Sequence, residues 1–493
     1  MGEVLTADLC VVGAGSGGFG AACAAARLGA RVVLLEAADG VGGTSTWAGV
    51  NNWEPVAGGT GLCTELYEHL RLTPDAVCLQ KRKCSYHPER PWGWYDRDLE
   101  RSDYRLSLSR RTGVPVTFEP QALDDVMQEF LAATGCCDLR LRTSFTEVDV
   151  DRPSRRIRAV LARDTGGDEL RVEAAVFVDA TADTHVARGV GCRHTIGPEG
   201  PDVYSETSAS CTDGLVLNNA SPCYRIAAVG EGESTRVEPL PDDCDVDADD
   251  IRAVTSIRTY PNGDLNMNPL HLMTGAEAYD LGSRARDVAF ARARLHWHVM
   301  QTRYAEPFGR WRRTWMSPAL GVRETYRLVG RYVLREQDID AGLAAQEHDD
   351  IVAIADHSVD FHGARPSREL TGPYGIPYRC LLPLEIDNLL VACRGASFSS
   401  IGASSCRLSR TMMMLGQAAG TAAALFGGDV AQGDPASLRQ QLVEDGAAPT
   451  LEHGWLDAMT DVEPTPADER MPRKGVADRP PTVRLPSGPD ARP

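Results

Sequence analysis

Hydrophobic and polar residues follow two different periods at the start of the chain, and the change between them marks a strand, a turn and a helix. An apolar run covers residues 7–12, glycines and a serine follow over residues 13–18, and an alanine-rich stretch continues to Ala30. A second apolar strand over residues 31–35 is closed by Glu36. This order predicts a βαβ unit whose glycine-rich turn opens the helix.

The hydrophobic pattern predicts several elements after this unit. Residues 120–135 have the spacing of an amphipathic helix, and Leu139–Val150, Arg156–Arg163 and Leu170–Val178 alternate as three strands of a β-meander. By contrast, residues 51–112 are rich in Trp, Pro and charge, which predicts an irregular excursion over a ligand and no sheet.

The second half of the chain returns to regular patterns. A long helix is expected over Ala285–Tyr304, and a buried strand over Asn388–Cys393. A glycine- and serine-rich loop follows, and then a helix over Cys406–Leu425. The first sheet is therefore interrupted by a large insert and completed near residue 390, whereas a nicotinamide dehydrogenase usually continues its sheet directly.

The glycine-rich turn carries the clearest chemistry. Gly13 permits the tight turn, Gly15 lets the backbone approach a pyrophosphate, and Gly18 lets the helix pack on the sheet. The helix N-terminus offers free N–H groups to the phosphates. Glu36 can accept hydrogen bonds from a ribose 2′-OH, and its charge disfavours a 2′-phosphate. FAD or NAD therefore fits this turn, and NADP does not.

Composition excludes several classes of protein. With 493 residues, 43% hydrophobic and 24% charged, the chain is expected to be a soluble globular enzyme of two joined domains. Its net charge of −18 argues against a nucleic-acid partner. No stretch reaches the length of a membrane span, so no membrane partner is expected. Whether the chain forms a homodimer is left open.

The 14 cysteines do not form the pattern of a disulfide framework or a metal site. No CxxC pair is present, and Cys10 and Cys23 fall in the first βα unit, where small core residues are expected. This usage favours a reducing, cytoplasmic location. His296 and His298 point to different sides of a helix, so no metal site is predicted there.

Several segments in order resemble one flavoprotein family. The chain is similar to the FAD-dependent oxidoreductases of the glutathione-reductase-type, two-dinucleotide-binding flavoprotein superfamily, and specifically to the broad FAD-dependent oxidoreductase family. The matching segments are GAGSGG with Glu36, VGGTST at 41–46, NNWEPVAGGTGL at 51–62, FVDATADTHVARGVG at 177–191, GVRETYRLVGRYVL at 321–334, PYGIPYRCLLPLEIDNLLVACRG at 373–395 and RLSRTMMMLGQAAGTAAA at 407–424.

The resemblance implies an FAD cofactor and a set of residues around it. Gly42, Gly43 and Thr44 would line the phosphates and the ribityl side. Phe145 would present backbone groups to adenine, and the pair Ala180-Thr181 would close over the nucleotide.

The resemblance also reaches the last strand and helix. Arg394 occupies the place where many relatives carry an acid that binds the ribityl chain, so that contact departs from the family pattern. The helix starting near Cys406 would aim its N-terminus at the pyrimidine end of the flavin, where negative charge collects on reduction. Gly402, Ala403 and Ser404 are small enough to let backbone amides approach.

Pattern and resemblance together predict an α/β fold: a Rossmann-like FAD-binding domain with a β-meander, interrupted by a mixed α+β substrate or cap domain. The expected divisions are 1–56, 112–200 and 372–430 for the discontinuous FAD-binding domain, 57–111 and 201–371 for the cap, 431–457 for a terminal helix region, and 458–493 for a proline-rich tail.

Candidate residues for proton transfer and substrate binding lie in the large insert and in the segment that leads from it back to the first sheet. His362 is the leading proton mover, and Asp360 would share its face if the segment is extended. Arg323 and Arg407 are candidate clamps for a carboxylate or for flavin carbonyl oxygens. For Arg323, an ion pair with its neighbour Glu324 is the alternative.

Tyr374 is a further candidate, because it flanks the turn that returns to the flavin domain and could form a wall of the flavin site. Ordinary packing is the alternative for this ring.

The function expected first is an FAD-dependent dehydrogenase or oxidase, which takes a hydride from a C–H next to O or N of a small polar metabolite onto flavin N5. No second dinucleotide fingerprint is present, so electrons would leave to oxygen or to an external acceptor or reductase. An FAD monooxygenase with an external reductant is the second hypothesis, although the segment 182–184 lacks the Asp-Gly dipeptide of many aromatic hydroxylases. A flavin-bearing electron-transfer or non-catalytic subunit is the third. The alanine, arginine and aspartate usage suggests a GC-rich bacterial genome and a role in specialised metabolism.

Overall fold

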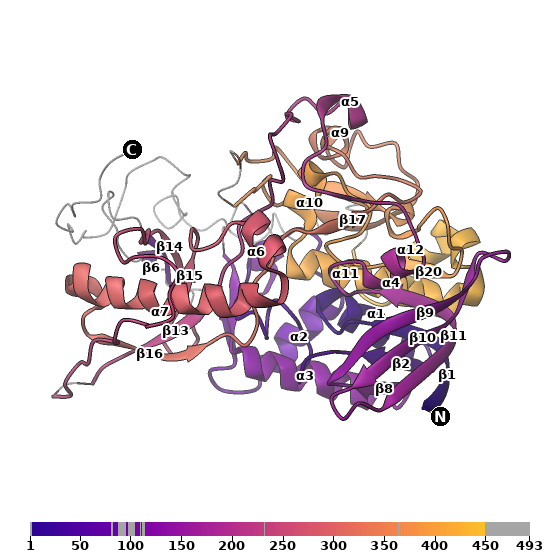
Figure 1. Cartoon of the computed structure of the whole chain (residues 1–493). Coiled ribbons are helices and arrows are strands. Elements are labelled where there is room, and N and C mark those ends of the chain that lie inside the picture. The colour runs from indigo at the N-terminus through magenta and orange to yellow at the C-terminus, as the bar shows by residue number, and fades with distance from the viewer. Residues whose placement is uncertain are drawn as a thin grey trace.

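A seven-stranded sheet forms one half of the molecule in the computed structural model (Figure 1). Its strands follow the order β8-β2-β1-β11-β10-β9, and β20 also pairs with β11. The described residues are 2–79, 82–86, 95–96, 104–108, 110, 114–230, 232–362, 365 and 367–448. The strands of this sheet are β1 Glu3–Val12, β2 Val32–Leu35, β8 Cys137–Arg140, β9 Thr143–Asp151, β10 Arg156–Asp164, β11 Glu169–Asp179 and β20 Leu389–Val391.

Strand β11 joins the parallel part of this sheet to the antiparallel part. It pairs in parallel with β1 along one edge. On the other edge its first half pairs antiparallel with β10 and its end pairs in parallel with β20. The β-meander and the late strand therefore meet on one central strand, as the sequence predicts for an interrupted nucleotide-binding sheet.

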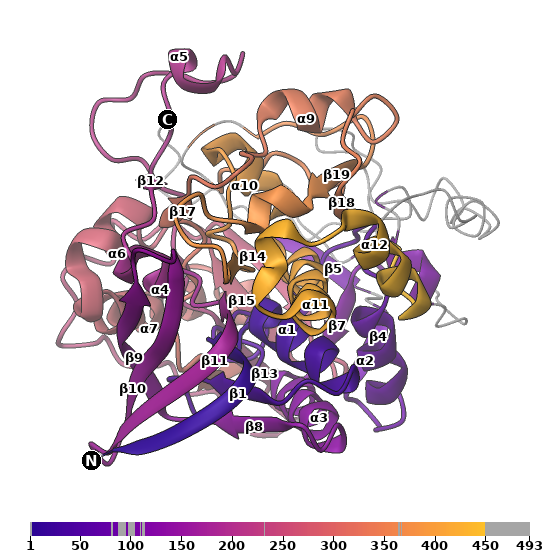
Figure 2. The same ribbon diagram turned by 90° about the vertical axis from the view of Figure 1, so that its right-hand side faces the viewer.

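Two helices far apart in the chain pack tightly on this sheet. They are α1 (Ser16–Arg27) and α11 (Ser409–Phe426), which lie side by side in Figure 2. A Cβ added to Gly416 would lie 1.9 Å from the Gly17 carbonyl oxygen, and one added to Gly420 would lie 2.0 Å from that of Ala21. The contacts advance in the same direction along both helices, so both N-termini point toward the same edge of the sheet.

A second sheet lies to the left of the first in Figure 1, with helix α7 (Ala285–Arg303) running along it. Buried side chains of β13 and β15 pack with Leu295, Trp297 and other α7 residues in one apolar cluster. The strands in spatial order are β16 Trp311–Met316, β13 Tyr224–Ala228, β15 Leu265–Pro269, β14 Thr255–Thr259, β5 Arg82–Tyr86 and β6 Tyr95–Asp96.

Further strands and helices lie outside these two sheets. The remaining strands are β3 Asn52–Trp53, β4 Val77–Leu79, β7 Val116–Phe118, β12 His194–Ile196, β17 Tyr326–Leu328, β18 Ile351–Ala355 and β19 Tyr374–Pro377. The remaining α-helices are α2 Leu62–Leu70, α3 Pro120–Ala133, α4 His185–Gly189, α5 Pro201–Tyr204, α6 Gly275–Leu281, α8 Ala305–Phe308, α9 Glu336–Ala341, α10 Ser400–Cys406 and α12 Pro435–Glu444.

Most long patterned segments fold as predicted, but two are divided. Helices α3 and α7 and the meander β9–β11 are confirmed. The strand predicted over Leu139–Val150 is instead two strands, because Arg142 adopts a left-handed φ of +54°. Strand β8 then extends the parallel sheet, whereas β9 joins the meander. The helix predicted over Cys406–Leu425 is interrupted near its start, because Cys406 ends α10, Leu408 is extended, and α11 begins at Ser409.

The expectation of an irregular segment over residues 51–112 is wrong for the part that the structure describes. Strands β3 and β4 pair with β7 in a three-stranded sheet, and α2 lies between them in the chain. The Trp53 ring packs on Phe118 with centroids 5.0 Å apart. Strands of two or three residues contain too few positions for an alternating pattern to reveal them. The expected tail, 458–493, lies outside the described residues.

Within the described ranges, none of the helices is both long and apolar enough to cross a membrane.

A fully buried histidine in the second sheet predicts acid sensitivity. The Tyr224 hydroxyl lies 2.7 Å from His296 Nδ1, and Thr255 Oγ1 lies 3.1 Å from Nε2. Burial lowers the pKa of His296 to about 3. Between pH 6.5 and 3 the unfolded imidazole binds a proton that the folded one does not, so stability falls as the pH falls. At pH 5 the loss is about 2 kcal/mol relative to neutral pH.

Urea unfolding at pH 7.5 and pH 5.0 tests this expectation. The wild type should lose about 2 kcal/mol more than a His296→Gln variant over this interval. A His185→Gln variant, which removes an exposed imidazole, should keep the wild-type pH dependence. Equal pH dependence in the wild type and the His296 variant would contradict the assignment.

Candidate active site

Three glycines shape the turn between β1 and α1. Gly13 has φ +93°, and an added Cβ there would lie 2.6 Å from the Ala180 carbonyl oxygen. A Cβ on Gly18 would lie 1.7 Å from the carbonyl oxygen of Gly13. Gly15 differs, because a Cβ there would meet no atom within 4 Å. The first two glycines are therefore required by the fold, while Gly15 borders open space at the start of the helix.

A second glycine pair closes on this turn. The Gly42 amide donates to the Ala14 carbonyl oxygen at 2.8 Å, and an added Cβ on Gly43 would lie 2.9 Å from the Cα of Gly15. Both glycines of the pair have positive φ, +93° and +54°. Two stretches of backbone thus meet at the N-terminus of α1, and Thr44 follows them on the surface. Such an arrangement of helix N–H groups and close backbone is suited to an anionic diphosphate.

Glu36 stands at the end of β2, where the sequence predicts a ribose contact. Its Oε2 accepts a hydrogen bond from the Ala14 amide at 2.6 Å, and its Oε1 accepts one from Ala38 at 2.8 Å. Burial raises the pKa of this carboxyl. A carboxylate has further lone pairs beyond these two bonds, so Glu36 can still accept a hydrogen bond from a ribose hydroxyl. That contact stays a prediction.

The end of β11 is braced by a buried acid. Asp179 accepts hydrogen bonds from the Ala187 amide at 2.9 Å and from the Thr181 hydroxyl at 2.7 Å. Burial raises the pKa of Asp179. This bracing holds Ala180 beside Gly13, so the predicted cover residues, Ala180 and Thr181, lie next to the glycine turn.

Arg394 is paired with a carboxylate that the sequence did not single out. Its Nη2 donates to Asp183 Oδ1 at 2.7 Å, and the Thr325 hydroxyl donates to the same oxygen at 2.5 Å. Burial alone would raise the pKa of Asp183, but the Arg394 charge and these bonds lower it below its ordinary value. An acid is therefore present beside Arg394, although it comes from the segment after β11.

The predicted role of the 402–404 segment needs correction. Helix α10 begins at Ser400, so Gly402 and Ser404 lie inside it and not before a helix. The Gly402 amide donates to Ser399 Oγ at 3.0 Å, and the Ser404 hydroxyl donates to the Ile401 carbonyl at 2.7 Å. The Gly402 amide is thus committed to the helix cap. The N-terminus that points to the sheet edge is that of α11, which starts at Ser409.

Two of the four predicted catalytic residues contact Asp360, and a third, Arg323, is near enough for its charge to act on His362. The His362 amide donates to Asp360 Oδ1 at 2.9 Å, and its ring Nδ1 lies 3.5 Å from Oδ2. Arg407 Nη2 donates to the Asp360 carbonyl at 3.2 Å. Arg323 Nη1 donates to the Asn219 carbonyl at 2.6 Å. The contact between Asp360 and His362 depends on a turn, with His362 at φ +46°, and not on the extended segment that the sequence suggested.

Burial and mutual repulsion set the charges of this group, which we call the arginine–histidine cluster (Arg323, Arg407, Asp360 and His362). Burial, and then the charge of Arg407, lower the pKa of Arg323 to about 9. Burial also lowers the pKa of Arg407. Burial and the neighbouring Arg323 charge lower the pKa of His362 to about 3, so its imidazole is neutral at pH 7. Burial opposes ionisation of Asp360, but the His362 hydrogen bond and the Arg407 charge hold its pKa well below the usual range.

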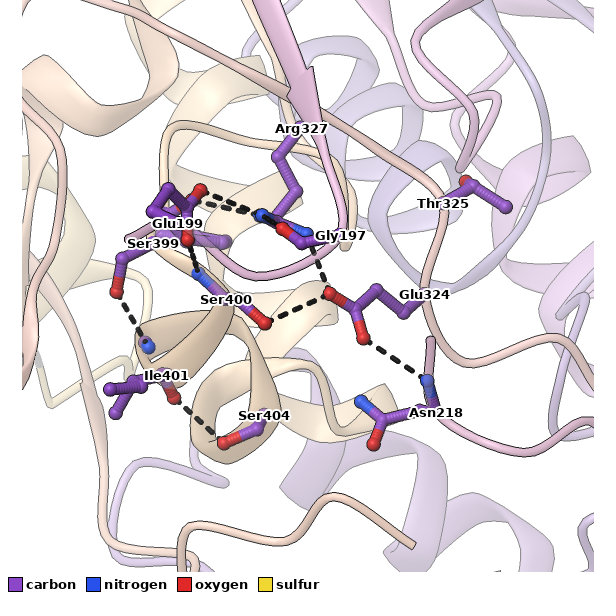
Figure 3. A network of polar contacts seen from close by, with 12 residues as sticks. Gly197, Glu199, Asn218, Glu324, Thr325, Arg327, Ser399, Ser400, Ile401 and Ser404 are labelled. Carbon is purple, nitrogen blue, oxygen red and sulfur yellow. Dashed lines mark hydrogen bonds and ion pairs between the residues drawn. The ribbon is translucent and has the colours of Figure 1, made fainter. Parts of the chain in front are cut away.

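Glu324 does not pair with Arg323, so the alternative proposed for that arginine is wrong. Its Oε1 instead accepts Arg327 Nη1 at 2.6 Å (Figure 3). Arg327 also donates to Glu199 Oε1 at 2.7 Å, and Glu199 Oε2 accepts the Ser400 amide at 2.8 Å. This buried network fixes the start of α10 against the segment around β17. The sequence suggested Arg323 because it adjoins Glu324 in the chain. The carboxylate of Glu324 instead faces Arg327, three residues further along.

The other two candidates lie in packed surroundings. Tyr374 is fully buried, and its hydroxyl lies 2.6 Å from Ser405 Oγ. It makes none of the hydrogen bonds that join the arginine–histidine cluster. Phe145 is half-buried on β9, opposite Ala162 of β10. A flavin or adenine contact for these two residues stays a prediction.

In the part of the chain that the structure describes, there is no group of three or more His, Cys, Asp or Glu residues placed to hold a metal ion.

A glycine-rich turn between a parallel strand and a helix N-terminus, closed by a second glycine pair, is typical of dinucleotide-binding proteins. The model of the FAD dependent oxidoreductase family matches residues 8–440, and the chain belongs to that family. It is therefore an enzyme whose cofactor is FAD. The open space at Gly15 fits this cofactor, because the glycine turn leaves room for a diphosphate beside the helix N-terminus.

Solved structures with a similar fold are distant in sequence. A geranylgeranyl bacteriochlorophyll reductase-like protein from Thermoplasma acidophilum is 11% identical, with 94% of this chain and 98% of that chain covered and a TM-score of 0.42. A triple mutant of the flavin-dependent brominase Bmp2 is 13% identical, with 89% and 84% covered and a TM-score of 0.43. The p-nitrophenol 4-monooxygenase PnpA from Pseudomonas putida DLL-E4 is 13% identical, with 67% and 70% covered and a TM-score of 0.38. The comparison with curated proteins gave no match.

Proposed function

We propose that this flavoenzyme is a dehydrogenase or oxidase that removes a hydride from a C–H next to O or N of a small polar metabolite. The observation that carries the proposal is His362, whose Nε2 has no hydrogen-bond partner among the described residues and whose other ring nitrogen faces Asp360, near the charges of Arg323 and Arg407. Arg394, paired with Asp183 just after β11, is close enough to Arg407 for its charge to lower the Arg407 pKa. The charge of Arg394, which follows strand β20 of the first sheet, therefore acts on the cluster.

The cofactor would be held by residues of both glycine turns. Gly13, Gly15 and Gly18 would face the diphosphate together with the segment 42–44, and Glu36 would bind the ribose. When bound, FAD supplies the hydride acceptor. The antiparallel meander on β11 supports a glutathione-reductase-type arrangement of this domain.

His362 is suited to accept the substrate proton. Its Nε2 is buried and has no hydrogen-bond partner among the described residues, so it is available to a ligand. Asp360 faces the other ring nitrogen at 3.5 Å, where it orients the imidazole and stabilises the cation that forms. Arg323 and Arg407 would hold the polar part of the substrate.

Electrons would then leave to oxygen or to an external acceptor, in keeping with the single dinucleotide fingerprint of the sequence. The proposal places the enzyme in the cytoplasm of a bacterium, in specialised metabolism.

Anaerobic titration of the purified yellow protein tests this function. A metabolite substrate alone should bleach the 450 nm band of the wild type, and a His362→Gln variant should bleach about 100-fold or more slowly. His185→Gln, an exposed histidine variant, should bleach at the wild-type rate. Bleaching only by an added reductase, with an oxygenated product under air, would favour a monooxygenase instead. Failure of every small molecule to bleach the protein would favour an electron-transfer or non-catalytic subunit.

A further inference from the structure

Two half-buried arginines in the arginine–histidine cluster lack an ion-pair partner among the described residues. In the described part of the chain, Arg323 and Arg407 form no ion pair with a carboxylate oxygen. The bonds of Arg323 go to the Asn219 carbonyl and the Ser221 hydroxyl, both neutral groups. The bond of Arg407 goes to a backbone carbonyl, and its Nε is buried without a partner among the described residues. Charges partly withdrawn from water are more stable when paired, so two half-buried arginines without a carboxylate partner favour the binding of an anion.

The charges of these side chains can be counted. Arg323 and Arg407 carry two positive charges, Asp360 carries one negative charge, and His362 is neutral. Arg394 adds nothing to the balance because Asp183 neutralises it at 2.7 Å. Among these four side chains, positive charge therefore exceeds negative charge by one. A single carboxylate would balance this charge, whereas a phosphate dianion would leave an excess of negative charge beside Asp360.

We propose that the cluster selects a substrate with a carboxylate group, held by Arg323 and Arg407, and a hydroxyl on the adjacent carbon, held at His362 Nε2. The planar fork of each guanidinium matches the two oxygens of a carboxylate. A neutral hydroxyl suits the site better than an ammonium group, which would add a positive charge where one is already in excess. The substrate class is therefore a 2-hydroxycarboxylate.

This inference rests on the proposed function for its chemical step. Oxidation of a 2-hydroxycarboxylate to the 2-oxo acid releases a hydride from carbon, which FAD accepts, and a proton from the hydroxyl, which His362 Nε2 accepts. The C–O single bond becomes a carbonyl, so two electrons and two hydrogen nuclei are accounted for. The carboxylate itself is unchanged and serves only to hold the reacting carbon in place.

Binding can be measured apart from turnover. The FAD-loaded protein would be titrated anaerobically with three series of three to six carbons: 2-hydroxycarboxylates, the matching carboxylates without the hydroxyl, and the matching 1,2-diols. The readouts are the rise in unfolding temperature and the perturbation of the flavin spectrum. Both carboxylate series should bind, and the diols should not. The unreactive carboxylates should perturb the spectrum without bleaching it.

Arginine variants then test the assignment. Arg323→Gln and Arg407→Gln should each weaken carboxylate binding by about 10- to 100-fold, since a charge-assisted hydrogen bond is lost. Arg163→Gln, which changes an exposed arginine paired with Glu169, should bind as the wild type does. Binding of diols as strongly as carboxylates, no binding of any carboxylate, or unchanged affinity in both cluster variants would overturn the inference.

The two proposals fail in different ways. If carboxylates bind through Arg323 and Arg407 but no 2-hydroxycarboxylate bleaches the flavin, the anion site stands and the 2-hydroxycarboxylate class is wrong; if no metabolite of any class bleaches it, the dehydrogenase or oxidase function is refuted. If an amine or a diol bleaches the flavin while carboxylates do not bind, the function stands and the substrate class is wrong.

Discussion

A Gly15→Val variant is expected to fold normally and to purify without colour. The fold has room for the added side chain, because a Cβ at Gly15 meets no atom within 4 Å. We propose that the diphosphate of FAD lies in that space, so the valine methyl groups would occupy the site of the cofactor. We expect FAD affinity to fall by at least about 100-fold, or about 2.7 kcal/mol. Absorbance at 450 nm after desalting and fluorescence titration with FAD measure the loss.

A matched variant separates the cofactor site from a general effect of valine. Gly200 precedes helix α5 with φ −68°, close to the −63° of Gly15 before α1, and it too has open space around its Cβ position. Gly200→Val should keep the yellow colour and the wild-type unfolding temperature. A Gly15→Val protein that retains FAD with wild-type affinity would refute the assignment of this turn to the diphosphate.

Replacing Arg327 by methionine is expected to cost about 3–5 kcal/mol of stability. Arg327 is almost completely buried between Glu199 and Glu324, with nitrogen–oxygen distances of 2.7 and 2.6 Å. Removing the cation leaves two buried carboxylates without their common partner. Methionine fills a similar volume, so the loss reports the charges and hydrogen bonds more than a cavity. Urea unfolding followed by circular dichroism measures the change.

Two comparisons make this result specific. Arg163→Met removes an exposed ion pair with Glu169 and should cost no more than about 1 kcal/mol. Adding Glu199→Gln and Glu324→Gln to Arg327→Met should recover part of the stability, because no unpaired carboxylate then remains. Equal losses for the Arg327 and Arg163 variants would show that the buried network contributes little.

The sequence by itself determined the features that depend on near neighbours. The first βαβ unit follows from an apolar run, three glycines and Glu36 within 30 residues, and steric limits on the backbone leave that turn few alternatives. The helices over 120–133 and 285–303 follow from a hydrophobic period repeated over several turns. The family and the FAD cofactor were predictable for the same reason, since the motifs that carry them are local.

Only the tertiary structure decided which charged groups meet. Glu324 adjoins Arg323 in the chain but pairs with Arg327, and Arg323 bonds to Asn219, 104 residues away. Asp183 meets Arg394 across 211 residues. Such pairs depend on where the strands and loops bring each side chain and on how much water burial removes. No hydrophobic period encodes these pairs. The sequence therefore predicts which residues are candidates for the chemistry, whereas the tertiary structure determines their partners and their charges.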